Sequence, residues 1–222
     1  YVAAKGGNNE ESHNHNDIGN FVVYVDGNPL IVDAGVETYT RKTFGPHRYD
    51  IWTMVSPYHT LLPTIDGEEQ LPGPDYKATG ASCEISDEKS VFTLDIAAAY
   101  GDEAEIESWE RKLTLHRGSN IEVIDTYKLS KKPEEIVSSF LTPCNVDISE
   151  PGKIRLSNRN FGRNRKSGQG TMTYPVGRNV SFQKIHLTDA QMNSVWGTDL
   201  TRVSLIAKNP AVEDSWTYLI SA

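Results

Sequence analysis

The chain has 222 residues, of which 37% are hydrophobic, and a formal net charge of −8. The mean hydropathy is −0.48, and no apolar run approaches the ~20 residues that a membrane-spanning helix needs, which excludes membrane insertion of that kind. The acidic charge argues against nucleic acid as a partner, because phosphate binding favours a basic surface.

The length and the run of predicted elements favour one large all-β domain over residues 1–222. The chain begins at Tyr1, without methionine and without a signal sequence, so we expect it to be processed or cut from a longer polypeptide. Residues 1–20 are rich in Gly and Asn and lack helical periodicity, which predicts a loop.

The clearest element is a hairpin. Two apolar runs, Phe21–Val25 and Leu30–Asp33, flank a turn that contains Asp26 and Gly27. Residues 36–60 then mix aromatic and charged side chains, which indicates a long loop that enters a strand near Trp52–Val55. Pro and Gly near residue 73 predict a further break.

From about residue 75 the sequence repeats short strand-like runs separated by Gly, Pro, Asn and Asp. This punctuation predicts an antiparallel β-sandwich with few or no helices. The expected strands are Tyr76–Ile85, Val91–Ala97, Ala104–Leu115, Ile121–Leu129, Glu135–Leu141, Lys153–Leu156, Gly170–Tyr174, Val180–Leu187, Thr201–Ala207 and Ser215–Ile220. Only Lys132–Glu135 and Asp189–Ser194 look briefly helical.

The remaining features of the sequence are two cysteines and one basic segment. Cys83 and Cys144 lack the paired spacing of a metal knuckle, and free thiols or one disulfide are equally compatible with the sequence. Residues 158–168 form a basic, Gly-containing loop whose cations, among them Arg159, Arg163 and Arg165, are able to pair with carboxylates or sulfates, or else are solvated.

The segment with the most chemical content contains His13 and His15. If it is extended, these two imidazoles point to the same face. With Asp33 at the end of the hairpin and His59 beyond it, the set supplies three zinc ligands, His15, Asp33 and His59, and leaves His13 free for substrate. The alternative is structural: loop histidines satisfied by neighbouring polar groups, a strand-end cap and a core histidine.

The same residues resemble a known family. The segment from Lys5 to Phe21, with its Ser-His-Asn-His-Asn-Asp sequence, then Leu30–Gly35, Tyr58–Thr60 and Asp66–Gly67 are similar to the C-terminal domain of the heparinase II/III-like polysaccharide lyases. The resemblance is specific over about residues 5–70, the part that would hold the metal and the catalytic histidine.

The resemblance implies an enzyme built from an N-terminal α/α toroid and this β-sandwich, with His15, Asp33 and His59 on zinc and His13 in catalysis. It also implies β-elimination on a uronic-acid-containing polysaccharide, heparan-like or alginate-like, outside the cytoplasm in the periplasm or after secretion. Nothing in the chain predicts the toroid, so we expect this portion alone to be inactive. Arg41, Arg48 and Tyr49 are candidate substrate-binding residues because they carry cationic or phenolic groups near the histidines.

Two other functions fit parts of the sequence. A cupin-like metal enzyme also begins with His-x-His, but it expects a Glu a few residues later where this chain has Asn16–Asn20. A non-catalytic carbohydrate-binding sandwich would use the histidines and tryptophans only as sugar contacts and would need no metal.

Overall fold

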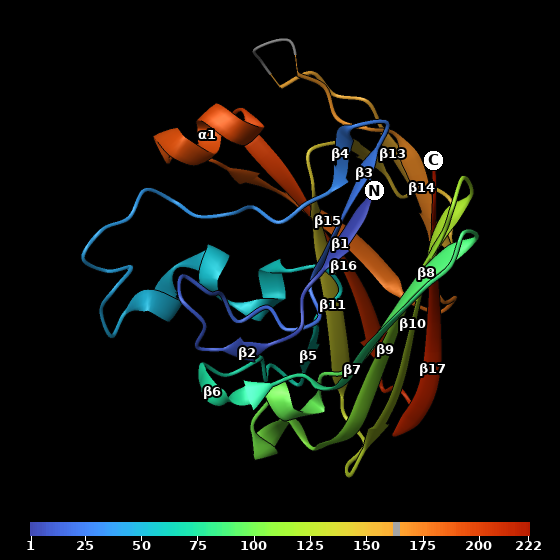
Figure 1. Ribbon diagram of the computed structural model, residues 1–222. Helices are drawn as coiled ribbons and strands as arrows, with labels where there is room; N and C mark the ends of the chain where they lie inside the picture. Colours follow the sequence, from blue (N-terminus) through green and yellow to red (C-terminus); the bar gives the residue numbers. More distant parts are fainter. Residues whose placement is uncertain (162–164) are drawn as a thin grey trace.

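The computed structural model describes residues 1–161 and 165–222 and consists mainly of antiparallel sheets (Figure 1). The largest sheet has the strand order β12-β13-β14-β17-β10-β9-β8-β7. Its strands are β7 Thr79–Ile85, β8 Lys89–Asp95, β9 Ile106–His116, β10 Asn120–Leu129, β12 Asn145–Asp147, β13 Lys153–Ser157, β14 Gly170–Thr173 and β17 Glu213–Ser221.

Smaller sheets complete the sandwich. A four-stranded sheet has the order β15-β16-β11-β5, formed by β15 Asn179–His186, β16 Asp199–Lys208, β11 Glu135–Thr142 and β5 Pro63–Ile65. A three-stranded sheet contains β1 Val2–Ala4, β3 Phe21–Val25 and β4 Asn28–Ile31, and a two-stranded ribbon joins β2 Asn8–Asn9 to β6 Gly73–Lys77. The predicted β-sandwich fold is therefore confirmed.

The core lies between the sheets because the long strands alternate buried and exposed side chains. In β9, for example, Trp109 and Leu113 are buried, whereas Glu110 and Lys112 are exposed. Trp109 stacks on Tyr127 of β10 with 4.7 Å between ring centroids, which places this tryptophan in the core rather than at a sugar-binding surface.

Helical structure is short. The one α-helix in the described part is α1, Ala190–Trp196, which confirms the helical prediction near residue 190. The 3-10 helices are η1 Arg48–Asp50, η2 Trp52–Met54, η3 Ser56–Tyr58, η4 Ala97–Ala99 and η5 Asp102–Ala104. Within the described residues, no helix is both long and apolar enough to cross a membrane.

Three expectations from the sequence about secondary structure are wrong. Residues 1–20 are not a loop throughout, since β1 pairs with β3 and β2 pairs with β6. Trp52–Val55 is not a strand, since Trp52–Met54 forms η2, and Pro57 in η3 lacks the N–H that a strand ladder needs. Residues 132–134 are not helical either, because the Asp66 carboxylate accepts hydrogen bonds from the N–H groups of Glu134 and Glu135 and holds the chain in a loop before β11. Both cysteines are free thiols, Cys83 exposed and Cys144 buried.

Asp189 caps α1 and also ties it to the loop that follows β4. Its carboxylate accepts hydrogen bonds from the N–H groups of Met192 and Thr38, both at 3.0 Å. The bond from Met192 is the main reason that the pKa of Asp189 lies below its usual value. We expect Asp189→Ala to lower the free energy of unfolding by about 1 kcal/mol at neutral pH, the usual cost of losing such a cap.

The sign of the pH dependence follows from the lowered pKa. The unfolded carboxyl binds protons more readily, so the stabilisation is complete above its unfolded pKa of about 3.9 and is lost as the pH falls through the folded pKa. Urea unfolding of wild type and Asp189→Ala should therefore converge in acid. Asp189→Asn, which keeps a cap without a titrating group, is the control; a gap between wild type and Asp189→Ala that is unchanged in acid would contradict this account.

Candidate metal centre

Four side chains from three separate segments converge on one point. His15 and Asp17 lie in the loop between β2 and β3, Asp33 follows β4, and His59 follows η3. Each offers one nitrogen or oxygen atom, and these four atoms all lie within 4.8 Å of one another. His15 is 7% exposed and His59 is 2% exposed, so the cluster is largely shielded from water.

Asp33 is held by hydrogen bonds through both carboxylate oxygens. Oδ2 lies 2.8 Å from His59 Nδ1 and accepts a 2.8 Å hydrogen bond from the Asn20 amide, while Oδ1 accepts one from the N–H of Gly35 at 2.7 Å. Burial opposes the charged form, but the nearby His59 and these hydrogen bonds outweigh it and hold the pKa of Asp33 well below its usual range. Asp33 is therefore a carboxylate at neutral pH.

The two histidines are electrostatically different. Burial would lower the pKa of His59, but contact with the Asp33 carboxylate raises it instead. Burial and the neighbouring His59 lower the pKa of His15, which favours a neutral imidazole with a free lone pair. Their ring centroids are 5.3 Å apart.

His59 also carries a polar atom that the surrounding residues leave without a partner. Its Nε2 is buried and has no hydrogen bond among the described residues. In the neutral His59 ring, a proton on Nδ1 that is donated to Asp33 leaves a lone pair on Nε2, the arrangement typical of a metal-binding histidine supported by a carboxylate. Two imidazoles, two carboxylates and this unpartnered nitrogen form a donor set that fits a divalent cation such as zinc.

Asp17 is the member of the cluster that the sequence analysis did not select. Its carboxylate contacts the Lys5 ammonium and is 8% exposed. A signal was present: Asp17 stands two residues after His15, the same interval that separates His15 from His13. With Asp33 already hydrogen-bonded to His59, Asp17 adds a second carboxylate to the donor set.

His13 does not lie on the same face as His15. It has a left-handed backbone with φ of 61°, in a turn where the N–H of Asn14 donates to the carbonyl of Glu11 at 3.1 Å. The imidazole is exposed, stacks on Tyr39 with 5.8 Å between centroids, and has Nδ1 3.2 Å from the Tyr39 hydroxyl. The assumption of an extended segment is thus wrong, and His13 stands outside the buried cluster, next to solvent.

Comparisons with known proteins identify the family of this chain. The family described as "Heparinase II/III-like, C-terminal" matches residues 1–212. This chain belongs to that family. No curated protein sequence matches the chain.

Two solved structures of similar fold are named as a heparan sulfate lyase and a heparinase III. Heparan sulfate lyase HepC from Pedobacter heparinus superposes with a TM-score of 0.73 at 13% identity, with 99% of this chain and 32% of that chain covered. The heparinase III BT4657 gene product gives 0.72 at 14% identity, with 99% and 32% covered. At such identities the likeness concerns the fold, and this heparinase II/III-like chain spans about a third of the length of those proteins. Because the chain belongs to this family, the cupin-like alternative is excluded.

A buried arginine supports the loops of this heparinase II/III-like domain that carry the cluster. Arg111 is 1% exposed and pairs with Asp125 through Nε at 2.7 Å and Nη2 at 2.6 Å. Its remaining N–H groups donate to the carbonyls of Gly19 at 2.9 Å, Thr60 at 3.2 Å and Leu61 at 2.7 Å. One core side chain therefore fixes both the segment after Asp17 and the segment after His59.

Gln70 gives a second support on the other side of the loop. The side-chain amide of Gln70 exchanges two hydrogen bonds with the backbone of Ile18, at 2.9 and 2.8 Å. The backbone carbonyl of Gln70 accepts a further hydrogen bond from the Asn16 side chain at 3.1 Å. Neither Gln70 nor Arg111 was selected from the sequence, because a lone polar residue gives no sign of its partners.

The three predicted substrate-binding residues differ in their surroundings. Arg48 is half-buried and donates to the carbonyls of Asn14 and Thr43, so it supports the loop that carries the histidines. Burial raises the pKa of Tyr49. Arg41 is exposed. Their roles toward a substrate stay predictions.

The basic segment 158–168 is partly neutralised. Arg159 forms an ion pair with Asp199, with Nη1 2.6 Å from Oδ1. Arg163 lies outside the described residues. Arg165 donates to the carbonyl of Ser194 and has no carboxylate partner in the described part of the chain.

Proposed function

We propose that this chain is the metal-binding C-terminal domain of a polysaccharide lyase that cleaves uronic-acid-containing polysaccharide by β-elimination. The observation that carries the proposal is the buried cluster of two histidines and two carboxylates, with the unpartnered Nε2 of His59, in a member of the heparinase II/III-like family. His15, Asp33 and His59 would hold zinc, with Asp17 as the additional carboxylate beside them.

The roles of the residues follow from their exposure and contacts. Bound zinc would supply a fixed positive charge that favours negative charge in nearby groups. His13, which is exposed and stands outside the cluster, would meet a substrate and hold or move a proton at an imidazole nitrogen. Tyr39 fixes that ring from one side by stacking and a hydrogen bond.

The rest of the active site would come from the remainder of a longer polypeptide. This chain covers 32% of heparan sulfate lyase HepC, which leaves room for an N-terminal α/α toroid in the whole protein. We propose that the toroid completes the cleft and supplies the other catalytic groups. The substrate would be a heparan-like or alginate-like acidic polysaccharide, met in the periplasm or after secretion.

The test is formation of unsaturated uronate, followed by ultraviolet absorbance, with heparan sulfate and alginate as substrates. We expect no activity from residues 1–222 alone and activity from the polypeptide extended by its toroid. In the extended protein, His13→Ala should lower kcat/KM by about 10²- to 10⁴-fold, the usual contribution of a general acid or base.

His47→Ala is a matched control because His47 is exposed and its ring forms a hydrogen bond only with Asp50 among the described residues. It should leave kcat/KM near the wild-type value. Lyase activity from residues 1–222 alone would contradict the division of labour between domains, and an active His13→Ala enzyme would contradict the role of His13.

A further inference from the structure

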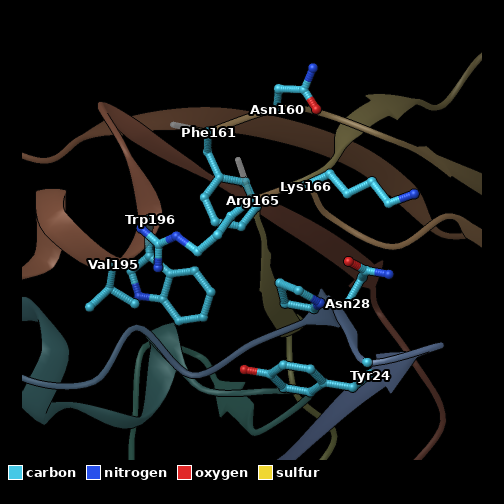
Figure 2. Close-up of a pocket in the computed structure, with 10 residues that line it drawn as sticks. Tyr24, Asn28, Asn160, Phe161, Arg165, Lys166, Val195 and Trp196 are labelled. Atoms are coloured by element: carbon cyan, nitrogen blue, oxygen red, sulfur yellow. The ribbon is translucent and has the colours of Figure 1, made fainter. Parts of the chain in front are cut away.

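A second site shares no residue with the cluster of His15, Asp17, Asp33 and His59. It lies between the β3–β4 hairpin, the end of α1 and residues 160–161 and 165–166 (Figure 2). It is a pocket of about 810 Å³. The described residues that line it are Tyr24, Gly27, Asn28, Pro29, Asn160, Phe161, Arg165, Lys166, Val195 and Trp196.

One side of the pocket is apolar and fixed in place. Figure 2 shows the rings of Phe161 and Trp196 on one side and Tyr24 opposite them. The Trp196 indole donates a 2.9 Å hydrogen bond to the carbonyl of Ala34, which locks its orientation. Rigid aromatic faces of this kind suit the C–H faces of a sugar ring.

The polar groups of the pocket are cationic or neutral. Arg165 and Lys166 line it, and none of the described lining residues is a carboxylate, although the whole chain has a net charge of −8. Arg165 contributes a buried Nε that has no hydrogen-bond partner among the described residues. Its guanidinium carbon lies 5.2 Å from the centre of the Phe161 ring. A planar, always charged guanidinium beside an aromatic face suits a carboxylate or sulfate.

Neutral donors and acceptors complete the lining. The Tyr24 hydroxyl has no hydrogen bond within the described residues, and the amides of Asn28 and Asn160 also line the pocket. Hydroxyl and amide groups beside an apolar face are the mixture that sugar hydroxyls require.

We propose that this pocket binds an anionic sugar residue, with its carboxylate or sulfate on Arg165 and Lys166 and its ring against Phe161 and Trp196. The inference rests on the proposed function, since it assigns an additional contact for the same acidic polysaccharide at a distance from the reacting bond. The pocket would hold one part of the polysaccharide while another part of the polysaccharide lies at the metal cluster.

The test is calorimetric titration of residues 1–222, treated with chelator to separate this pocket from the metal cluster. Three probes distinguish the anions: a heparin-derived tetrasaccharide, an unsulfated uronate tetrasaccharide and neutral maltotetraose. We expect binding of at least one anionic probe and none of maltotetraose. Arg165→Gln should weaken that binding about tenfold or more, the value of a charged hydrogen bond, and Lys166→Gln should weaken it less and in a salt-dependent way.

Arg155→Gln is the matched control, because Arg155 is an exposed arginine on β13 that forms an ion pair with Glu150. It should bind like wild type. Equal affinity for maltotetraose, no binding of either anionic probe, or unchanged binding by a folded Arg165→Gln variant would overturn the proposal. Metal content of the same variants separates the two claims: Arg165→Gln should keep its zinc, whereas His15→Ala should lose zinc and still bind the anionic probe.

Discussion

Zinc is expected to raise the free energy of unfolding of this chain by about 4 kcal/mol when free zinc exceeds the dissociation constant a thousandfold. The physical reason is that the folded chain presents His15, Asp17, Asp33 and His59 within 4.8 Å, whereas the unfolded chain scatters them. The measurement is urea unfolding with and without zinc, in the absence of chelator. His15→Ala removes one buried donor nitrogen and should abolish the zinc-dependent increase.

The control for this prediction is His47→Ala, which removes an exposed imidazole outside the cluster. It should keep the full zinc-dependent increase. A zinc effect of equal size in His15→Ala would place the ion elsewhere, and it would contradict the site.

Arg111→Met is expected to lower the free energy of unfolding by about 3–5 kcal/mol, the cost of leaving a buried charge without its partner. Asp125 is fully buried and would face no cation, and the carbonyls of Gly19, Thr60 and Leu61 would each lose a donor. Because these carbonyls belong to the loops that carry the cluster, zinc affinity should fall in the same variant. Urea unfolding and zinc titration measure the two effects.

Lys112→Met is the matched control, since Lys112 is the exposed neighbour of Arg111 on β9 and should change the stability by less than ~0.5 kcal/mol. The double variant Arg111→Met with Asp125→Leu should recover part of the lost stability, because it removes the unpaired charge. An Arg111→Met protein within 1 kcal/mol of wild type, roughly the effect of an average substitution, would contradict the role assigned to this ion pair.

The sandwich was predictable because its main signal is local. Alternation with a period of two marks β9 and β10, and the turn at Asp26 and Gly27 marks the β3–β4 hairpin, where both residues have positive φ. These features need no knowledge of distant residues. The signal for the short helix near residue 190 is local as well, because Asp189 directly precedes α1 and caps it.

Other features depend on contacts between distant segments. Arg111 faces the core at the register position of Asp125, and only the pairing of β9 with β10 brings the two charges together. The loop before β11 follows from Asp66, almost 70 residues earlier in the chain, rather than from the residues near Lys132. The left-handed turn at His13 likewise separates two histidines that a regular extended segment would have aligned.

The cluster of two histidines and two aspartates was partly predictable. The sequence pattern selected His15, Asp33 and His59, and the structure brings these three together with Asp17. The hydrogen bond from His59 to Asp33 was not predictable, because it depends on how the loop after η3 meets the end of β4.

The most direct test of this account is elemental analysis of the purified chain, prepared without chelators and offered zinc, beside His15→Ala and His47→Ala. The account predicts about one zinc per chain in wild type and in His47→Ala, and almost none in His15→Ala. A folded wild-type chain without zinc, or a His15→Ala chain that keeps it, would contradict the central claim that this cluster is a metal site.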